Sequence, residues 1–240
     1  MTGRAMTKAS DVAQYIKSGQ KSLGTGDMKT ALKEFLEASN LDPENPEANY
    51  FIGVTCTRME EYEMGSDYLE KVIASEMAYI NKVHARMILG YIYTIREEYE
   101  KAIAMFKGIV KSGFGSAQAY AAIGYIMDRM GDFKKAVMTL YKAIEIDPKN
   151  ANAHNSLGYI FTQANLNLEE ALKECKKAVS INKNNPAYLD SLGWVYYKLG
   201  RIKQAKIYLN KALKKAPASE EIRAHLQAVL DSDRNKNMDS

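Results

Sequence analysis

The residue types that most often perform catalysis or bind metals are few in this chain and widely spaced. The three histidines, His84, His154 and His225, lie far apart in the sequence, and no His-Glu-x-x-His pair occurs. Cys56 and Cys175 form no metal-binding or redox pair either. We therefore expect no metal ion, no cofactor and no catalytic site in this chain.

Two short glycine motifs, Gly24 to Gly26 and Gly113 to Gly115, have the residue type that nucleotide-binding loops use. Both lack the third glycine and the preceding strand that such a loop needs to approach a pyrophosphate. Both also fall at expected helix ends, where glycine is common. An enzyme is consequently the function class that the sequence supports least.

A more specific signal for binding is the residue that directly follows each of six regularly spaced glycines. In order, these residues are Gln20, Val54, Tyr91, Tyr125, Tyr159 and Trp194. Four consecutive members are aromatic, the class of residue that most often dominates binding energy. One interpretation, which we favour, is a ladder of rings that grips an extended segment or a helix of a partner. The other is that tyrosine, present sixteen times, is simply frequent and fills the inner curve.

The spacing of the same glycines indicates which elements position these rings. The glycines are Gly19, Gly53, Gly90, Gly124, Gly158 and Gly193, at intervals of 34, 37, 34, 34 and 35 residues, so one unit recurs six times. A good N-cap residue precedes the first helix of five copies, and Pro46 and Pro186 follow at the first helical position. The N-cap residues are Asp11, Asn45, Ser116, Asn150 and Asn185.

Each copy is expected to be a hairpin of two helices. Gly26, Gly131 and Gly200 suit the left-handed residue after a first helix, and Pro148 and Pro217 stop second helices. Small residues recur where the two helices must approach, and a larger apolar residue follows four positions later. On the second helices these pairs are Ala31 and Phe35, Ala102 and Phe106, Ala136 and Leu140, Ala171 and Cys175, and Ala205 and Leu209. Because each hairpin exposes an apolar side that only the next one can cover, the hairpins must stack.

These features resemble the tetratricopeptide repeat family. The match is closest in Leu189, Leu192-Gly193, Tyr196, Ala205, Leu209 and Pro217. The resemblance covers residues 12–219 and implies an all-α fold, a right-handed superhelical solenoid of antiparallel helix pairs. It also places His154, Cys56 and Cys175 at core positions, where a packing role is favoured over a metal or redox role.

The repeat pattern predicts the organisation of the chain. We expect a lead-in at 1–11 and repeats at 12–45, 46–79, 83–116, 117–150, 151–185 and 186–219, so that 12–79 holds two repeats and 83–219 holds four. The three inserted residues at 80–82 predict a bend or a looser joint between repeats two and three. A capping helix is expected at 220–230, followed by a flexible polar tail at 231–240.

In the family that the chain resembles, the first helices line a concave groove. The resemblance therefore implies a partner-binding groove whose charges nearly balance, which argues against a simple anion trap. Its expected residues are Tyr50, Arg58, Met87, Tyr91, Tyr125, Asp128, Arg129, Asn155, Tyr159, Asp190, Trp194 and Lys198. The paired Lys and Asn with which some family members clamp the C-terminus of heat-shock chaperones have mostly aromatic, apolar or acidic counterparts here.

The expected function is a non-enzymatic scaffold or adaptor for a protein or peptide partner. Residues 151–230 resemble the end of many bacterial tetratricopeptide proteins, several of which act at the cell envelope, in secretion or in pilus assembly. The alternative is a self-assembling structural protein, a homo-oligomer in which one copy docks on another. Its docking surface would be the N-terminal end of the array.

The net charge of +4 is unevenly distributed, because residues 169–215 contain eleven Lys or Arg against four Asp or Glu. This block indicates either an acidic or nucleic-acid partner or a solvated convex face, and we favour the latter, so nucleic-acid binding is not expected. No apolar run is long enough to span a membrane, and residues 1–10 lack the apolar core of a secretory signal. We expect a cytoplasmic protein as the chain stands, or a periplasmic or envelope protein if an N-terminal signal was removed.

Overall fold

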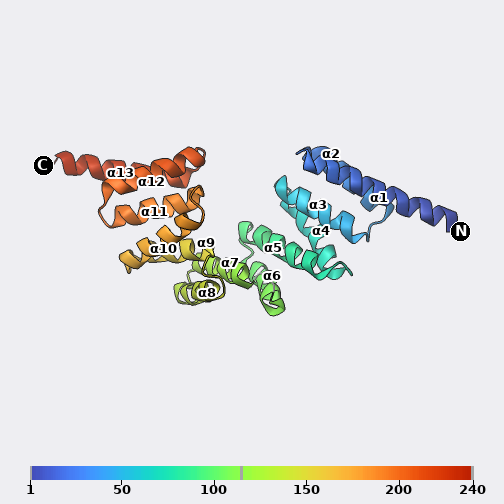
Figure 1. Cartoon of the computed structure of the whole chain (residues 1–240), viewed down its shortest axis with the longest axis horizontal. Helices are drawn as coiled ribbons and strands as arrows, with labels where there is room; N and C mark the ends of the chain where they lie inside the picture. Colours follow the sequence, from blue (N-terminus) through green and yellow to red (C-terminus); the bar gives the residue numbers. More distant parts are fainter. Residues whose placement is uncertain (1, 114–115, 239–240) are drawn as a thin grey trace. The chain divides into compact units, whose positions relative to one another are not determined.

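The computed structural model describes residues 2–113 and 116–238 of the 240-residue chain. This part contains thirteen helices and no strand, which confirms the predicted all-α class (Figure 1). The helices are α1 (Thr2–Gly24), α2 (Met28–Leu41), α3 (Pro46–Arg58), α4 (Tyr62–Ala74), α5 (Tyr79–Ile95), α6 (Tyr99–Ser112), α7 (Ser116–Arg129), α8 (Phe133–Ile146), α9 (Ala151–Gln163), α10 (Leu168–Ile181), α11 (Pro186–Lys198), α12 (Ile202–Lys215) and α13 (Glu220–Met238).

The chain divides into two compact units, Met1–Phe114 and Gly115–Ser240. In the first unit, α1 packs against α2, α3 against α4 and α5 against α6, and α2 and α4 also pack against the next helix. In the second unit, the pairs are α7 with α8, α9 with α10 and α11 with α12, while α13 packs against both α11 and α12. Each unit is therefore a stack of helical hairpins, as the repeat pattern predicts.

The division of the chain does not fall where the sequence predicts a looser joint. At the inserted residues 80–82, α4 packs directly against α5, and a bend or a looser joint at this place stays a prediction. The insertion is absorbed by α5, which starts at Tyr79 and has 17 residues, whereas α3, α9 and α11 have 13 each. Extra residues at a helix start lengthen the helix and leave its packing face intact.

Side-chain caps start several of the first helices. The side-chain oxygen of Asn45 accepts a hydrogen bond from the backbone N–H of Ala48 at 3.0 Å, and Asn150 and Asn185 cap α9 and α11 in the same way. These three predicted N-caps are confirmed. Ser116 is the first residue of α7 and adjoins the part of the chain that is not described.

The terminal helices are longer than the sequence predicts. Asp11 is not an N-cap, because α1 starts at Thr2 and runs through the expected lead-in, where good helix formers outnumber breakers. At the other end, α13 continues through the expected tail to Met238. An ion pair from Lys206 on α12 to Asp233 attaches the start of this polar extension to the preceding helix, and the flexibility of the tail from residue 231 stays a prediction.

The turns inside the hairpins contain residues in the left-handed conformation, one in most turns and two, Asn165 and Asn167, between α9 and α10. The prediction is confirmed at Gly26, Gly131 and Gly200, whose φ angles are 84°, 80° and 72°. In two other hairpins a glutamate adopts this conformation instead, Glu60 with φ of 65° and Glu97 with φ of 59°. Side chains disfavour positive φ, so the packing of the flanking helices must hold these two turns in place.

Within each hairpin the helices approach so closely that a first-helix glycine is required. A Cβ atom added at Gly90 would lie 2.4 Å from Cζ of Phe106, and one at Gly158 would lie 2.5 Å from Sγ of Cys175. The predicted pairs of small and large residues on the second helices are all at most 3% exposed. No described helix combines the length and apolarity that a membrane span requires.

Candidate functional site

The second unit contains a pocket of about 390 Å³ on the side of its first helices. Six of the twelve predicted groove residues line it: Tyr125, Asp128, Arg129, Asn155, Tyr159 and Asp190. The remaining lining residues are Ser156, Pro186, Ala187, Ser191, Ala216, Ser219, Glu221 and Ile222. The repeat pattern therefore predicts which side chains of this unit share one cavity, although it does not establish what the cavity binds.

Helical spacing explains how these side chains reach the same pocket. Residues three or four positions apart lie on one face of a helix. Tyr125 and Asp128 on α7 have this spacing, as do Asn155 and Tyr159 on α9. Because α9 packs against both α7 and α11, the three faces adjoin one another, and Asp190 of α11 completes the row.

The exposure of the predicted aromatic ladder is uneven. Tyr125 is 46% exposed, whereas Tyr159 and Trp194 are half-buried. In the first unit, Tyr91 is 52% exposed, but Val54 is buried and interrupts the series. The structure thus brings Tyr125 and Tyr159 together in one pocket, while Trp194 lies outside its lining.

Helix α13 forms one wall of the pocket, a role that the sequence analysis missed. Tyr159 Oη donates a hydrogen bond to Oε1 of Glu221 at 3.4 Å, and Nδ1 of His225 lies 3.0 Å from both carboxylate oxygens of Asp190. The His225 ring stacks on Trp194 with their centroids 4.1 Å apart. The signal for this placement was present, because Glu221 and His225 are four residues apart and flank the apolar stripe of α13.

One face of α13 carries an apolar stripe of four residues, Ile222, Leu226, Val229 and Leu230. Ile222, Leu226 and Val229 are buried, and Leu230 packs partly buried against the same core. The helix contacts α12 with this stripe and also contacts α11. It therefore covers the end of the hydrophobic core and contributes polar side chains to the pocket.

The pocket is acidic, in contrast to the predicted groove as a whole. Asp128, Asp190 and Glu221 line it, and Arg129 is the only cation among its described lining residues. Burial raises the pKa of Asp128, an effect that the neighbouring Arg129 charge opposes. Burial also raises the pKa of Tyr159, and the carboxylates around it raise it further. The predicted near-balance of charge refers to the groove residues of both units together, and this pocket is more acidic because Glu221 joins its lining.

Three pocket-side residues have side chains of the types that bind metals. Asp190, Glu221 and His225 offer ligand atoms that all lie within 4.8 Å of one another. One imidazole and two carboxylates are donor types that zinc accepts. His225 and Asp190 are 35 residues apart in the sequence, so a search for closely spaced metal ligands does not find the group of Asp190, Glu221 and His225.

The predicted groove residues of the first unit form a smaller polar group. Tyr50 on α3 is hydrogen-bonded to His84 on α5, with Oη and Nδ1 2.5 Å apart. Loss of solvation raises the pKa of Tyr50 and lowers that of His84, and the exposed Arg58 adds to the lowering. The last predicted member here, Met87, is half-buried on α5.

Comparison with known proteins identifies the repeat. A family model described as "TPR repeat" matches residues 124–164, and one described as "Tetratricopeptide repeat" matches residues 186–219. The chain is a tetratricopeptide repeat protein. Arrays of this kind are scaffolds for protein–protein interaction and are generally not enzymes.

Relatives of this tetratricopeptide protein match it to different extents. The TPR repeat-containing protein PA4667 of Pseudomonas aeruginosa is 42% identical over 57 residues, which are 24% of this chain and 10% of that protein. The chain thus matches only about a tenth of the relative's length. A MamA crystal structure is 25% identical with a TM-score of 0.62, covering 73% of this chain and 94% of MamA.

Two further solved structures share the fold alone. A tetratricopeptide repeat protein from Parabacteroides merdae has a TM-score of 0.75 at 13% identity, covering 95% of this chain and 89% of that one. The pilF protein of Pseudomonas aeruginosa has a TM-score of 0.70 at 15% identity, covering 92% of this chain and 99% of that one. These likenesses confirm the helical repeat architecture.

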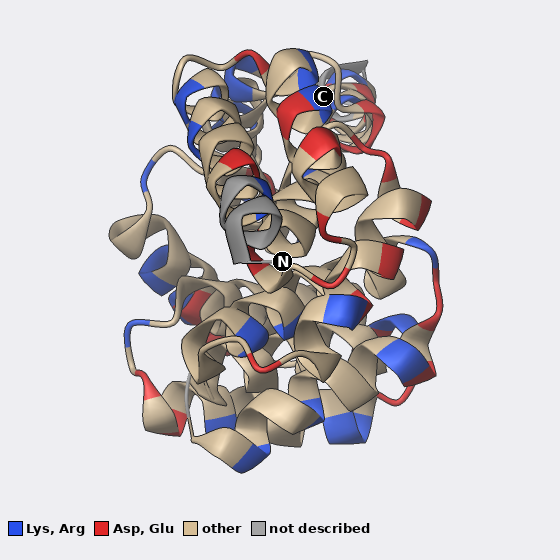
Figure 2. Ribbon diagram, turned by 90° about the vertical axis from the view of Figure 1, so that its right-hand side faces the viewer, with Lys and Arg blue, Asp and Glu red and all other residues tan. Residues whose placement is uncertain are grey.

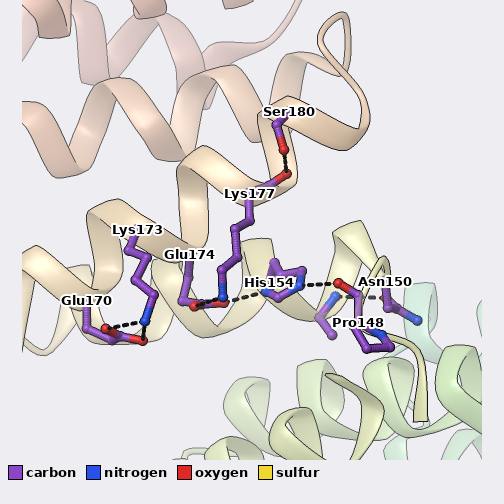
Figure 3. Close-up of polar contacts among 9 residues, drawn as sticks. Pro148, Asn150, His154, Glu170, Lys173, Glu174, Lys177 and Ser180 are labelled. Atoms are coloured by element: carbon purple, nitrogen blue, oxygen red, sulfur yellow. Dashed lines mark hydrogen bonds and ion pairs between the residues drawn. The ribbon is translucent and has the colours of Figure 1, made fainter. Parts of the chain in front are cut away.

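One buried ionic cluster in this tetratricopeptide protein lies away from the pocket. Nε2 of His154 donates to the carbonyl oxygen of Pro148 at 3.0 Å, and its Nδ1 contacts the carboxylate of Glu174, which also accepts from Lys177 at 2.7 Å (Figure 3). His154 and Glu174 are 1% and 3% exposed. Burial raises the pKa of Glu174, but the hydrogen bonds from Lys177 and His154 outweigh it, so the net pKa is lowered. His154 is a core residue, as predicted, and Glu174 is its missed partner.

The two thiols also lie in the core at their predicted positions. Cys56 and Cys175 are fully buried and unpaired. Burial raises the pKa of Cys56 to about 11 and that of Cys175 to about 12, so neither forms a thiolate near neutral pH. This environment suits the packing role that we favoured over a redox role.

The basic block of the tetratricopeptide array is partly neutralised by acids of the block itself and by Asp233 of α13. Four of its cations form ion pairs in the structure: Lys173 with Glu170, Lys177 with Glu174, Arg201 with Glu169, and Lys206 with Asp233. Over the chain as a whole, Figure 2 shows basic and acidic segments interspersed along the helices. This pairing favours the interpretation of a solvated face over that of a nucleic-acid surface.

Proposed function

We propose that this tetratricopeptide protein is a non-enzymatic scaffold or adaptor that binds a peptide or helix of a protein partner along its first helices. The observation that carries the proposal is the pocket of the second unit, which collects six predicted groove residues from three helices. Tyr125 leaves nearly half of its surface exposed beside this pocket. Tyrosine is enriched among residues that dominate binding energy, because its ring buries a large area while its hydroxyl hydrogen-bonds.

The chain provides a matched pair of tyrosines for a test. Tyr125 is 46% exposed on the first helix α7, and Tyr141 is 47% exposed on the second helix α8. We expect Tyr125→Ala to release proteins that the wild type captures from cells, whereas Tyr141→Ala retains them. Quantitative mass spectrometry of the captured proteins measures the difference, and circular dichroism checks that both variants remain helical.

Two results would count against this groove. Equal capture by the wild type and Tyr125→Ala, with an intact fold, would show that the ring does not bind a partner. Equal loss with Tyr125→Ala and Tyr141→Ala would point to a general effect of exposed rings. Either result removes the pocket from the proposed binding surface.

The cellular process that we propose is one of the bacterial envelope, secretion or pilus assembly. Its support is the resemblance of residues 151–230 to bacterial tetratricopeptide proteins and the shared fold of pilF. Cell fractionation of the native organism tests it. Recovery of the full-length protein exclusively with the cytosol would contradict an envelope role.

A second candidate function is self-assembly through the N-terminal end of the first unit. Val12 and Ile16 of α1 line a cavity of about 420 Å³ there, beside the charged Lys8, Asp42 and Glu47. An apolar floor with a charged rim has the make-up of a docking surface. Sedimentation velocity over a concentration series tests this candidate, and a monomer that persists to high micromolar concentration would exclude it.

A further inference from the structure

The pocket of the second unit has a chemical preference that its repeat architecture does not imply. We propose that it binds the guanidinium group of an arginine in the partner segment, a selectivity that rests on the proposed function of the groove. The first support is charge. Asp128 of α7, Asp190 of α11 and Glu221 of α13 reach one cavity from three helices, against the single lining cation Arg129.

The second support is the imbalance between hydrogen-bond acceptors and donors. Oδ1 of Asn155 is buried and has no hydrogen-bond partner among the described residues, although it belongs to a pocket-lining side chain. The nearby hydroxyl of Tyr159 already donates to Glu221. A guanidinium group carries five N–H donors and no acceptor, so it matches a pocket with surplus acceptors. A carboxylate or phosphate would meet three like charges instead.

The third support is the shape and character of the walls. The pocket volume of about 390 Å³ lies in the usual range for sites that enclose a small group. Tyr125 and Tyr159 place aromatic rings in the lining, against which the aliphatic stem and the planar guanidinium can pack. Arginine stacks on such rings more readily than lysine does, because its charge is delocalised and weakly hydrated.

The partly buried carboxyl group of Asp128 would gain from a further cation beside it. Burial raises the pKa of this carboxyl even though Arg129 is close enough to oppose the effect. A second cation beside Asp128 would stabilise its ionised form. The entry of an arginine would therefore compensate a buried charge of the unbound protein.

A metal ion is the competing occupant of the same carboxylates. It would use Asp190, Glu221 and His225, whose ligand atoms lie within 4.8 Å of one another. However, both oxygens of Asp190 already engage Nδ1 of His225 at 3.0 Å, and His225 also stacks on Trp194. A metal ion on Asp190, Glu221 and His225 would make no use of Asp128 or of Oδ1 of Asn155. A guanidinium group can donate hydrogen bonds to acceptors on both sides of the pocket.

The test uses the full chain and a peptide probe, acetyl-Leu-Ala-Arg-Ala-Leu-amide, with citrulline and glutamate versions of its central residue. Citrulline keeps the shape of arginine but lacks the charge. Titration followed by calorimetry and by amide chemical shifts of the labelled protein should give at least about ten-fold tighter binding for arginine, the effect of one hydrogen bond to a charged group. The largest shifts should lie on α7, α9 and the start of α13.

Protein variants localise the effect. Asp128→Asn and Glu221→Gln should each remove several-fold of the preference for arginine over citrulline, while Glu145→Gln, on the exposed face of α8, should retain it. Equal binding of the arginine and citrulline peptides at the pocket would overturn the inference and leave the proposed groove intact. Absence of pocket shifts at millimolar peptide would overturn it as well. Binding of zinc chloride at the pocket that prevents binding of the arginine peptide would also overturn the inference, because the carboxylates would then bind a metal ion.

Discussion

The buried pair of His154 and Glu174 allows a prediction whose sign depends on which partner is removed. His154→Leu leaves a carboxylate that is 3% exposed with only Lys177 to compensate it. Removing one partner of a buried ion pair typically costs about 3–5 kcal/mol, and we expect the lower end because Lys177 remains. Glu174→Leu leaves Nδ1 of the buried imidazole without its partner, and one unsatisfied buried nitrogen costs about 1–3 kcal/mol.

The double variant separates this explanation from simple loss of contacts. His154→Leu with Glu174→Leu replaces both ionisable groups by apolar ones of similar size, which is often close to neutral for a buried pair. We therefore expect the double variant to be more stable than His154→Leu alone. Urea unfolding followed by far-ultraviolet circular dichroism gives the four free energies of unfolding that the comparison requires.

A neighbouring ion pair is the control. Glu170 and Lys173 have the same helix and spacing as Glu174 and Lys177, but both of their side chains are substantially exposed (Figure 3). Glu170→Leu should change the free energy of unfolding by less than about 1 kcal/mol. If Glu170→Leu and Glu174→Leu destabilise equally, or if the double variant loses the sum of the two single losses, the reasoning about the buried pair is refuted.

The same cluster predicts a dependence on pH. The folded pKa of Glu174 is lowered from its ordinary value of 4.5, so its ionised form stabilises the folded state. This contribution is fully present above pH 4.5 and is lost as the pH falls through the folded pKa. The difference in unfolding free energy between the wild type and Glu174→Leu should therefore shrink as the protein is acidified below pH 4.5.

Two further predictions concern the packing of the hairpins and the attachment of α13. Gly90→Ala should lower the melting temperature by several degrees, because its Cβ would lie 2.4 Å from Phe106. A Cβ at Gly24 has no atom within 4 Å, so Gly24→Ala should be neutral or stabilising. Equal melting temperatures of the two variants in calorimetry would contradict the close approach at Gly90. His225→Ala should shift the emission of Trp194, the only tryptophan, to longer wavelength as water reaches the uncovered ring, and unchanged emission would contradict the stacking.

The sequence was sufficient for the features that recur in every repeat. The glycine interval predicted the hairpins, and Asn45 and Asn185 were recognisable as caps because their position relative to a proline leaves few alternatives. The pocket side of the first helices followed from the same periodicity, since Tyr125 and Tyr159 occupy equivalent positions. Caps and turns are set by residues close in sequence, and their recurrence in several repeats makes their prediction reliable.

The features that the sequence analysis missed depend on contacts specific to one place. Glu60 and Glu97 occupy left-handed positions where the turn rule expects glycine, so the rule gave no signal. Glu174 is one of several charged residues on α10, and only the hairpin geometry brings it to His154. The acidic character of the pocket depends in part on Glu221, which belongs to no repeat and has no equivalent from which to extrapolate.

Helix α13 contributes both to the core and to the pocket, and this limits how the gene can change in length. A duplication that inserted one more hairpin after Pro217 would preserve the repeating core, because within each unit the second helix of one hairpin packs against the first helix of the next. It would also move Glu221 and His225 one step away from Asp190 and Tyr159. An array with one hairpin more or fewer at this end would therefore keep a repeating core but take apart this pocket.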